Sequence, residues 1–61
     1  MYKKYCELRE ARGVNDSTVA NATGINKTTF ADWKSGRSEP KLKKLAAIAK
    51  YFGVTVDYFV D

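Results

Sequence analysis

The clearest hydrophobic pattern in this chain is a stripe of apolar residues near its C-terminal end, at the three- and four-residue intervals of one helix face. Its members are Leu42, Leu45, Ile48, Ala49 and Phe52. Pro40 lies just before the stripe and is expected at the first helical position, where its missing N–H costs nothing. Gly53 follows the stripe as a helix stop. The pattern therefore predicts an amphipathic helix that buries the five apolar residues.

The first dozen residues carry a similar spacing. Tyr2, Tyr5, Leu8 and Ala11 recur at helical intervals until Gly13, which is typical of a helix C-terminus. This segment is the first predicted helix.

Two shorter helical patterns occupy the middle of the chain. Asn15 and Asn26 are candidate N-caps, because an asparagine side chain can accept a hydrogen bond from a free backbone N–H of the first turn. Gly24 separates the two patterns. Val19, Ala20 and Thr23 form the inward side of the first, and Phe30 and Trp33 that of the second. Ser35, Gly36 and Ser38 then break the periodicity.

The last apolar residues permit two interpretations. A short helical turn from Val56 to Val60 would return Val56 and Phe59 to the core, whereas the alternation from Val54 to Val60 also suits a strand. A single strand would have no partner in this chain. The prediction is therefore an all-α fold of five helices.

Length and composition limit what these helices can do. Sixty-one residues predict one domain, residues 1–61, and such a chain buries only about 60% of its unfolded surface, which leaves little room for a catalytic cavity. No apolar run approaches the roughly 20 residues of a membrane span, and Tyr-Lys-Lys near the start does not resemble a signal peptide. We therefore expect a cytoplasmic protein without membrane contact.

Reactive side chains are few. Cys6 is the only cysteine and histidine is absent, which excludes disulfide frameworks, Cys/His zinc sites and Cys-His nucleophile pairs. We expect no metal, no cofactor and no enzymatic activity. Cys6 itself is most simply a small side chain on the first helix.

The net charge of +4 is concentrated in one segment. Residues 26 to 44 hold six basic and two acidic side chains, whereas the rest of the chain holds five of each. The six are Lys27, Lys34, Arg37, Lys41, Lys43 and Lys44. A local positive field attracts polyanions, although a charged stretch can also be a solvated face. For Lys43 and Lys44 we favour simple solvation, whereas Lys41 lies at the helix start beside the loop.

The two short helices around Gly24 form a helix-turn-helix, residues about 16–34, whose second helix would enter a DNA major groove. At about 100° per residue, its polar side chains fall on an arc of roughly 140° opposite Phe30 and Trp33. The polar side chains are Lys27, Thr28, Asp32 and Ser35, and the small apolar Ala31 lies among them. The exposed edge is therefore suited to meeting base edges.

Several motifs resemble one known family in the same order and at matching intervals. They are "LREARGV", "VANATGIN", "TTFADWKSG", "EP" and "LKKLAAIAKYFGVTVDYF". Each fragment is weak alone, but their joint spacing over nearly the whole chain resembles the Cro and phage-repressor (XRE) type of helix-turn-helix protein. The resemblance implies a lambda-repressor-like, five-helix DNA-binding domain.

Site residues follow from this resemblance by position. The family's base-reading positions fall on Lys27, Thr28, Ala31 and Asp32, and their chemistry suits guanine, the thymine methyl group and the cytosine amino group. The implied DNA-backbone contacts are Asn15, Thr29, Lys34, Ser35, Arg37, Ser38 and Lys41. The implied dimer contacts are Val54, Val56 and Tyr58, although Tyr58 could equally be a surface tyrosine. Asp32 could equally serve solubility.

The chain departs from the family pattern at three places. Asp16 replaces a glutamine that touches phosphate, and a carboxylate there repels phosphate. Lys34 replaces a glutamate that pairs with the arginine of the first helix, so Arg9 is expected to turn to Glu10, Asp32 or solvent. Thr23 replaces a core leucine, and this smaller polar side chain is expected to anchor the second helix weakly.

The expected function is sequence-specific binding of a palindromic double-stranded DNA operator as a homodimer, with regulation of transcription by repression. The alternative is a protein-interaction module on the same scaffold with weak or lost DNA affinity, which Asp16 and Asp32 favour.

Overall fold

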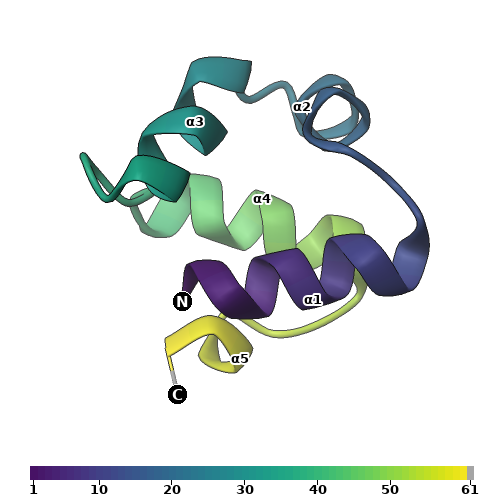
Figure 1. Ribbon diagram of the computed structural model, residues 1–61. Coiled ribbons are helices and arrows are strands. Elements are labelled where there is room, and N and C mark those ends of the chain that lie inside the picture. Colours follow the sequence, from purple (N-terminus) through teal and green to yellow (C-terminus); the bar gives the residue numbers. More distant parts are fainter. Residues whose placement is uncertain (61) are drawn as a thin grey trace.

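The computed structural model describes residues 1–60 as five helices, measuring 24 × 23 × 19 Å along its principal axes. The helices are α1 (Tyr2–Arg12), α2 (Asp16–Thr23), α3 (Lys27–Ser35), α4 (Leu42–Phe52) and α5 (Asp57–Val60). The α2–α3 pair packs on one side of α4, and α5 packs against α1 (Figure 1). The all-α prediction is confirmed, and the alternative strand over residues 54–60 is wrong: residues 54–56 are a loop and Asp57–Val60 form α5.

The predicted helix boundaries are set by the residues expected to set them. The side chains of Asn15 and Asn26 accept hydrogen bonds of 2.9 Å from the backbone N–H groups of Thr18 and Thr28, so each asparagine caps a short helix. The glycine after each of the first four helices adopts the left-handed conformation, with φ between 71° and 79°. Such a φ strains any residue with a Cβ, which explains why the helices end where glycine occurs.

The core is largely aromatic and centres on Tyr5, whose ring is fully buried. Its ring stacks on Phe30 and Trp33 of α3, with centroids 5.3 and 5.0 Å away, and meets Phe52 of α4 edge-on at 6.1 Å. Phe59 of α5 lies 6.4 Å from Trp33. Aromatic pairs at these separations add to the free energy gained by burial alone. One side chain of α1 therefore joins α3 and α4.

The hydroxyl of Tyr5 also joins α1 to α2. It donates a 2.6 Å hydrogen bond to Oδ1 of Asp16, the first residue of α2, and Arg9 Nη1 lies 3.6 Å from the same oxygen. The expectation that Arg9 turns to Glu10, Asp32 or solvent is therefore wrong, because Asp16 points back toward α1 and supplies a carboxylate. Arg9 also donates from Nη2 to the Cys6 sulfur at 3.6 Å, and this hydrogen bond raises the pKa of the guanidinium.

Two predictions about individual positions are wrong. Pro40 lies outside α4, since Lys41 is the N-cap and Leu42 the first helical residue. Leu42 is 71% exposed, whereas Pro40 two residues earlier is buried. The other four members of the α4 stripe are buried as predicted.

Replacing Tyr5 with phenylalanine should lower the free energy of unfolding at neutral pH by about 1–3 kcal/mol, since it removes a hydrogen bond to a charged group. This difference in the free energy of unfolding between wild type and variant should become smaller at alkaline pH. Burial, reinforced by the Asp16 hydrogen bond, raises the pKa of Tyr5 above its ordinary value of 10.0. The native state therefore binds more protons than the unfolded state above about pH 10, so this contribution is full below that pH and falls as the pH rises.

Urea unfolding of both proteins at about pH 8 and about pH 11 checks this prediction. Burial raises the pKa of Tyr2 to about 12 as well, so the variant should keep part of the alkaline decline. Tyr51→Phe is a matched control, because the described contacts of Tyr51 are made by its ring. A difference between wild type and Tyr5→Phe that does not change with pH would contradict the account.

Candidate nucleic-acid interface

The two faces of α3 differ in chemistry as predicted. Phe30 and Trp33 are buried, with 0% and 4% of their surface exposed. The opposite edge is open to solvent at its predicted positions: Lys27, Thr28, Ala31 and Ser35 are exposed and Asp32 is half-buried. The structure therefore brings the predicted base-reading residues onto one surface, and the aromatic residues hold that surface outward.

The predicted backbone-contact residues surround this edge. Asn15 caps the N-terminus of α2, and Thr29 is half-buried on α3. The remaining five are exposed: Lys34 and Ser35 in the last turn of α3, Arg37 and Ser38 in the loop, and Lys41 at the N-cap of α4. The N-termini of helices direct free N–H groups and a partial positive charge outward, which suits phosphate.

The loop after α3 is held in a compact shape by the end of that helix. The backbone carbonyl of Asp32 accepts from the N–H groups of Arg37 and Ser38, at 2.9 and 3.3 Å. The same carbonyl accepts from the Ser35 hydroxyl at 3.1 Å. Because these bonds tie the loop to the last turns of α3, Arg37 and Ser38 keep a defined position beside that helix.

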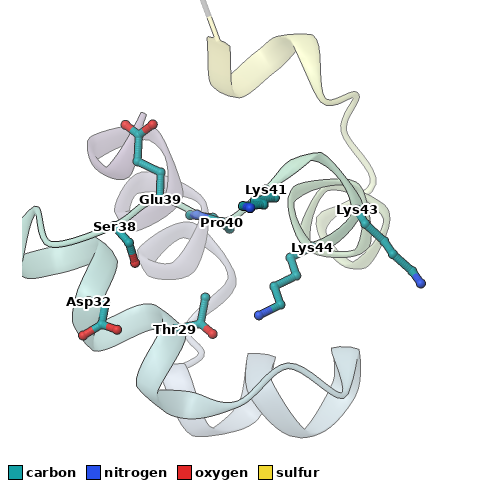
Figure 2. Close-up of a pocket in the computed structure, with 8 residues that line it drawn as sticks. All are labelled: Thr29, Asp32, Ser38, Glu39, Pro40, Lys41, Lys43 and Lys44. Atoms are coloured by element: carbon teal, nitrogen blue, oxygen red, sulfur yellow. The ribbon is translucent and has the colours of Figure 1, made fainter.

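Between α3, the loop and the first turn of α4 lies an open hollow of about 480 Å³ (Figure 2). Thr29 and Asp32 line it from α3, and Ser38, Glu39, Pro40 and Lys41 line it from the loop. Lys44 extends from α4 toward α3, whereas Lys43 points away. Predicted contact residues from two separate segments thus share one surface.

Lys44 lines the hollow together with Thr29, Asp32 and Lys41, although the sequence alone favoured simple solvation for it. Its spacing of three residues from Lys41 would have placed both on one side of α4. The direction of that side depends on the path of the loop, which the pattern of the sequence does not specify. Lys43 lines the hollow too, although its ammonium group is directed away.

Asp16 is directed toward α1, where it binds Tyr5 and Arg9. A carboxylate at this position therefore has a structural partner, and Lys34 is left exposed beside the recognition edge. The two departures from the family pattern thus compensate each other: Arg9 keeps an acidic partner and the α3 side gains a cation.

The predicted dimer residues lie at the opposite end of the chain. Val54, Val56 and Tyr58 are half-buried. The Tyr58 ring lies 5.5 Å from Phe59 and 5.2 Å from the Lys4 ammonium group. Val60 next to them is 60% exposed. Val54, Val56 and Tyr58 therefore pack partly against the core, and Val60 is the exposed apolar residue beside them.

Searches for other kinds of site found little. Within residues 1–60, no group of three or more His, Cys, Asp or Glu side chains lies close enough to hold a metal ion. None of the described helices has the length and apolar character needed to cross a membrane.

Comparison with known proteins decides the family. A helix-turn-helix family model matches residues 7–59. The chain belongs to this helix-turn-helix family, of the Cro/C1 type. The family resemblance drawn from the motifs is therefore confirmed.

Several relatives are longer proteins, and their names describe them as transcriptional regulators. The chain is 36% identical over 58 residues to the cryptic phage CTXphi transcriptional repressor RstR of Vibrio cholerae, covering 95% of this chain and 52% of the relative. It is 37% identical over 51 residues to the HTH-type transcriptional regulator AnsR of Bacillus subtilis, covering 84% and 44%. It is 29% identical over 55 residues to the HTH-type transcriptional activator BcrR of Enterococcus faecalis, covering 90% and 27%. The chain spans about half the length, or less, of these relatives.

Proposed function

We propose that this helix-turn-helix chain binds double-stranded DNA sequence-specifically and regulates transcription by occupying an operator. The observation that supports the proposal most is the orientation of α3: its aromatic residues are buried and its Lys27–Asp32 edge is open. The major groove admits a helix whose short polar side chains reach base edges. Lys27 would donate to guanine, Thr28 would place its methyl group against thymine, and Asp32 would accept from a cytosine amino group. Ala31 is small enough to allow close approach.

The cations and hydroxyl groups near the exposed edge of α3 would bind the two phosphate backbones. Lys34, Ser35, Arg37, Ser38 and Lys41 are exposed, Thr29 lines the hollow beside α3, and Asn15 caps the N-terminus of α2. Lys44 joins them across the hollow in Figure 2. Phosphate contacts fix the register of a protein on the duplex, whereas base contacts specify the sequence.

Repression is the direction that we propose, and its support comes from the relative named a transcriptional repressor. The relative named an activator shows that this type of domain also occurs in proteins of the opposite effect. The alternative, a protein-interaction module without DNA affinity, was favoured by Asp16 and Asp32. Asp16 has a structural partner in Tyr5, so only Asp32 still favours it.

Binding to duplex DNA should be strongly salt-dependent, because each phosphate that a Lys or Arg neutralises releases a counterion. For a surface that contacts about six phosphates, affinity for a random-sequence duplex should fall roughly a thousandfold between about 50 and 200 mM salt. Fluorescence anisotropy of a labelled duplex measures it. No binding at the lower salt concentration, or an affinity that does not change with salt, would contradict the proposal.

Lys27→Ala and Arg37→Ala should have different effects on a duplex that the wild-type protein selects from a random pool. Loss of Lys27 should reduce discrimination at one base pair by about 1–3 kcal/mol, whereas loss of Arg37 should weaken binding to all sequences alike. Both side chains are exposed, so neither change should affect folding. Lys3→Ala, an exposed lysine of α1, is the matched control. Identical effects of the first two variants would refute the assigned roles.

We also propose that the chain binds its operator as a homodimer through the segment of Val54, Val56 and Tyr58, with Val60 as an exposed apolar neighbour. Two copies related by a two-fold axis would read half-sites about 34 Å apart on a near-palindrome. Sedimentation of the saturated complex should therefore give two chains per duplex. A complex of one chain on a duplex that holds the full selected sequence would exclude the dimer.

A further inference from the structure

A second concave surface lies between α2 and α4, distinct from the predicted base-reading edge. Two adjoining hollows of about 410 and 470 Å³ share Thr23 and Ala47 in their linings. We call their combined surface the α2–α4 groove. Its inner end, with Lys50 and Tyr51, shares no lining residue with the hollow in Figure 2. Its other end shares Lys43 and Lys44 with that hollow.

The groove is open because of short side chains. The hydroxyl of Thr23 donates a 2.8 Å hydrogen bond back to the carbonyl of Val19. The side chain is thereby held against its own helix and does not extend toward α4. Ala22 beside it and Ala47 opposite are too small to fill the space. The result is an apolar strip between two helices.

The α4 wall of the groove is strongly basic. Lys43, Ala47 and Lys50 follow at intervals of four and three residues, so they share one helix face, and Lys44 lies beside Lys43. Tyr51 closes the inner end, with its ring edge-on to Phe52 at 4.9 Å. Among the residues that line either hollow there is no aspartate or glutamate. The lysines thus flank the apolar strip without acidic side chains in the lining.

We propose that the α2–α4 groove binds an acidic amphipathic segment of a partner protein, which lays its apolar side chains over Ala22 and Ala47 and pairs its carboxylates with the lysines. Charge complementarity supports this occupant, and an amphipathic helix in a groove is a common form of such recognition. A DNA strand fits less well, because the apolar strip of Ala22 and Ala47 offers phosphate no hydrogen-bond donor.

Binding of the partner segment in the α2–α4 groove would also regulate DNA binding, and this regulation rests on the proposed function. Lys44 lines both the groove and the hollow beside α3. A carboxylate that binds Lys44 from the groove removes a cation from the proposed DNA surface. The partner segment and duplex DNA therefore compete, so the partner releases the protein from its operator.

The probe is a fluorescein-labelled synthetic helical peptide with leucines and glutamates on one face, compared with the same peptide carrying glutamine for every glutamate. Lys50→Glu should weaken binding of the acidic peptide at least about tenfold and leave duplex affinity within about threefold, since Lys50 lies at the inner end. Lys3→Glu, the same charge change on exposed α1, should have little effect on either. The glutamine peptide should bind much more weakly than the acidic one.

Ala22→Leu tests the shape of the groove without a charge change. Ala22 is exposed, so the variant should fold, and its added bulk should reduce peptide affinity while duplex affinity stays the same. Unlabelled duplex should displace the peptide from the wild-type protein. Circular dichroism and thermal unfolding confirm that each variant is folded.

Four results would overturn the proposal. Equal binding of the two peptides would mean that the lysines do not select carboxylates. No effect of Ala22→Leu would mean that surface lysines alone hold the peptide, without the apolar strip. A parallel loss of duplex and peptide affinity in Lys50→Glu would mean that a DNA strand occupies it. Self-association of the wild type that Lys50→Glu abolishes would mean that a second copy does. Duplex binding is read in the same samples: if it is absent while the peptide results hold, the proposed function fails and the groove stands.

Discussion

The buried ring of Tyr5 is the interaction on which the rest of the structure depends. Through its faces it holds Phe30 and Trp33 of α3, through its edge it meets Phe52 of α4, and through its hydroxyl it fixes the first residue of α2. A chain of this length buries little surface, so a few large aromatic residues supply much of its stability. The same contacts turn one side of α3 inward and leave the Lys27–Asp32 edge outside. Stability and the proposed recognition surface therefore have one origin.

The charged side chains fall into two groups: an ion pair beside Tyr5, and cations exposed on the surface. Arg9 and Asp16 pair next to Tyr5, where each is about three-quarters covered. The cations of α3, the loop and the first turns of α4 stay exposed. An acidic side chain at the start of α2 would repel phosphate if it faced DNA, but here it is turned toward α1. The basic excess of residues 26 to 44 is thus left for an anionic partner.

Local chemistry made the helices predictable, and long-range packing explains the failures. Asn15 and Asn26 cap their helices and the glycines end theirs, because these effects act within a few residues. The partner of Arg9 and the orientation of Lys44 depend on how separate helices meet, which periodicity does not specify. Leu42 fits the apolar stripe by spacing, yet it is exposed at the first turn of α4 while Pro40 before it is buried. The inward face of α3 was predictable because Phe30 and Trp33 are large and spaced for one helix face. The α2–α4 groove was not, because it depends on the space left between two helices beside the short Thr23 side chain.

In the proposed complex, the outward edge of α3 meets duplex DNA while its aromatic side stays in the core. Titration of the isotope-labelled protein with a short duplex, followed by nuclear magnetic resonance of its amide groups, tests this directly. The account predicts that the largest shift changes fall on Lys27–Ser35 and the following loop, while the indole N–H of Trp33, the only tryptophan, remains protected from exchange. Shift changes centred on α1 and α5, with the α3 signals unmoved, would contradict it.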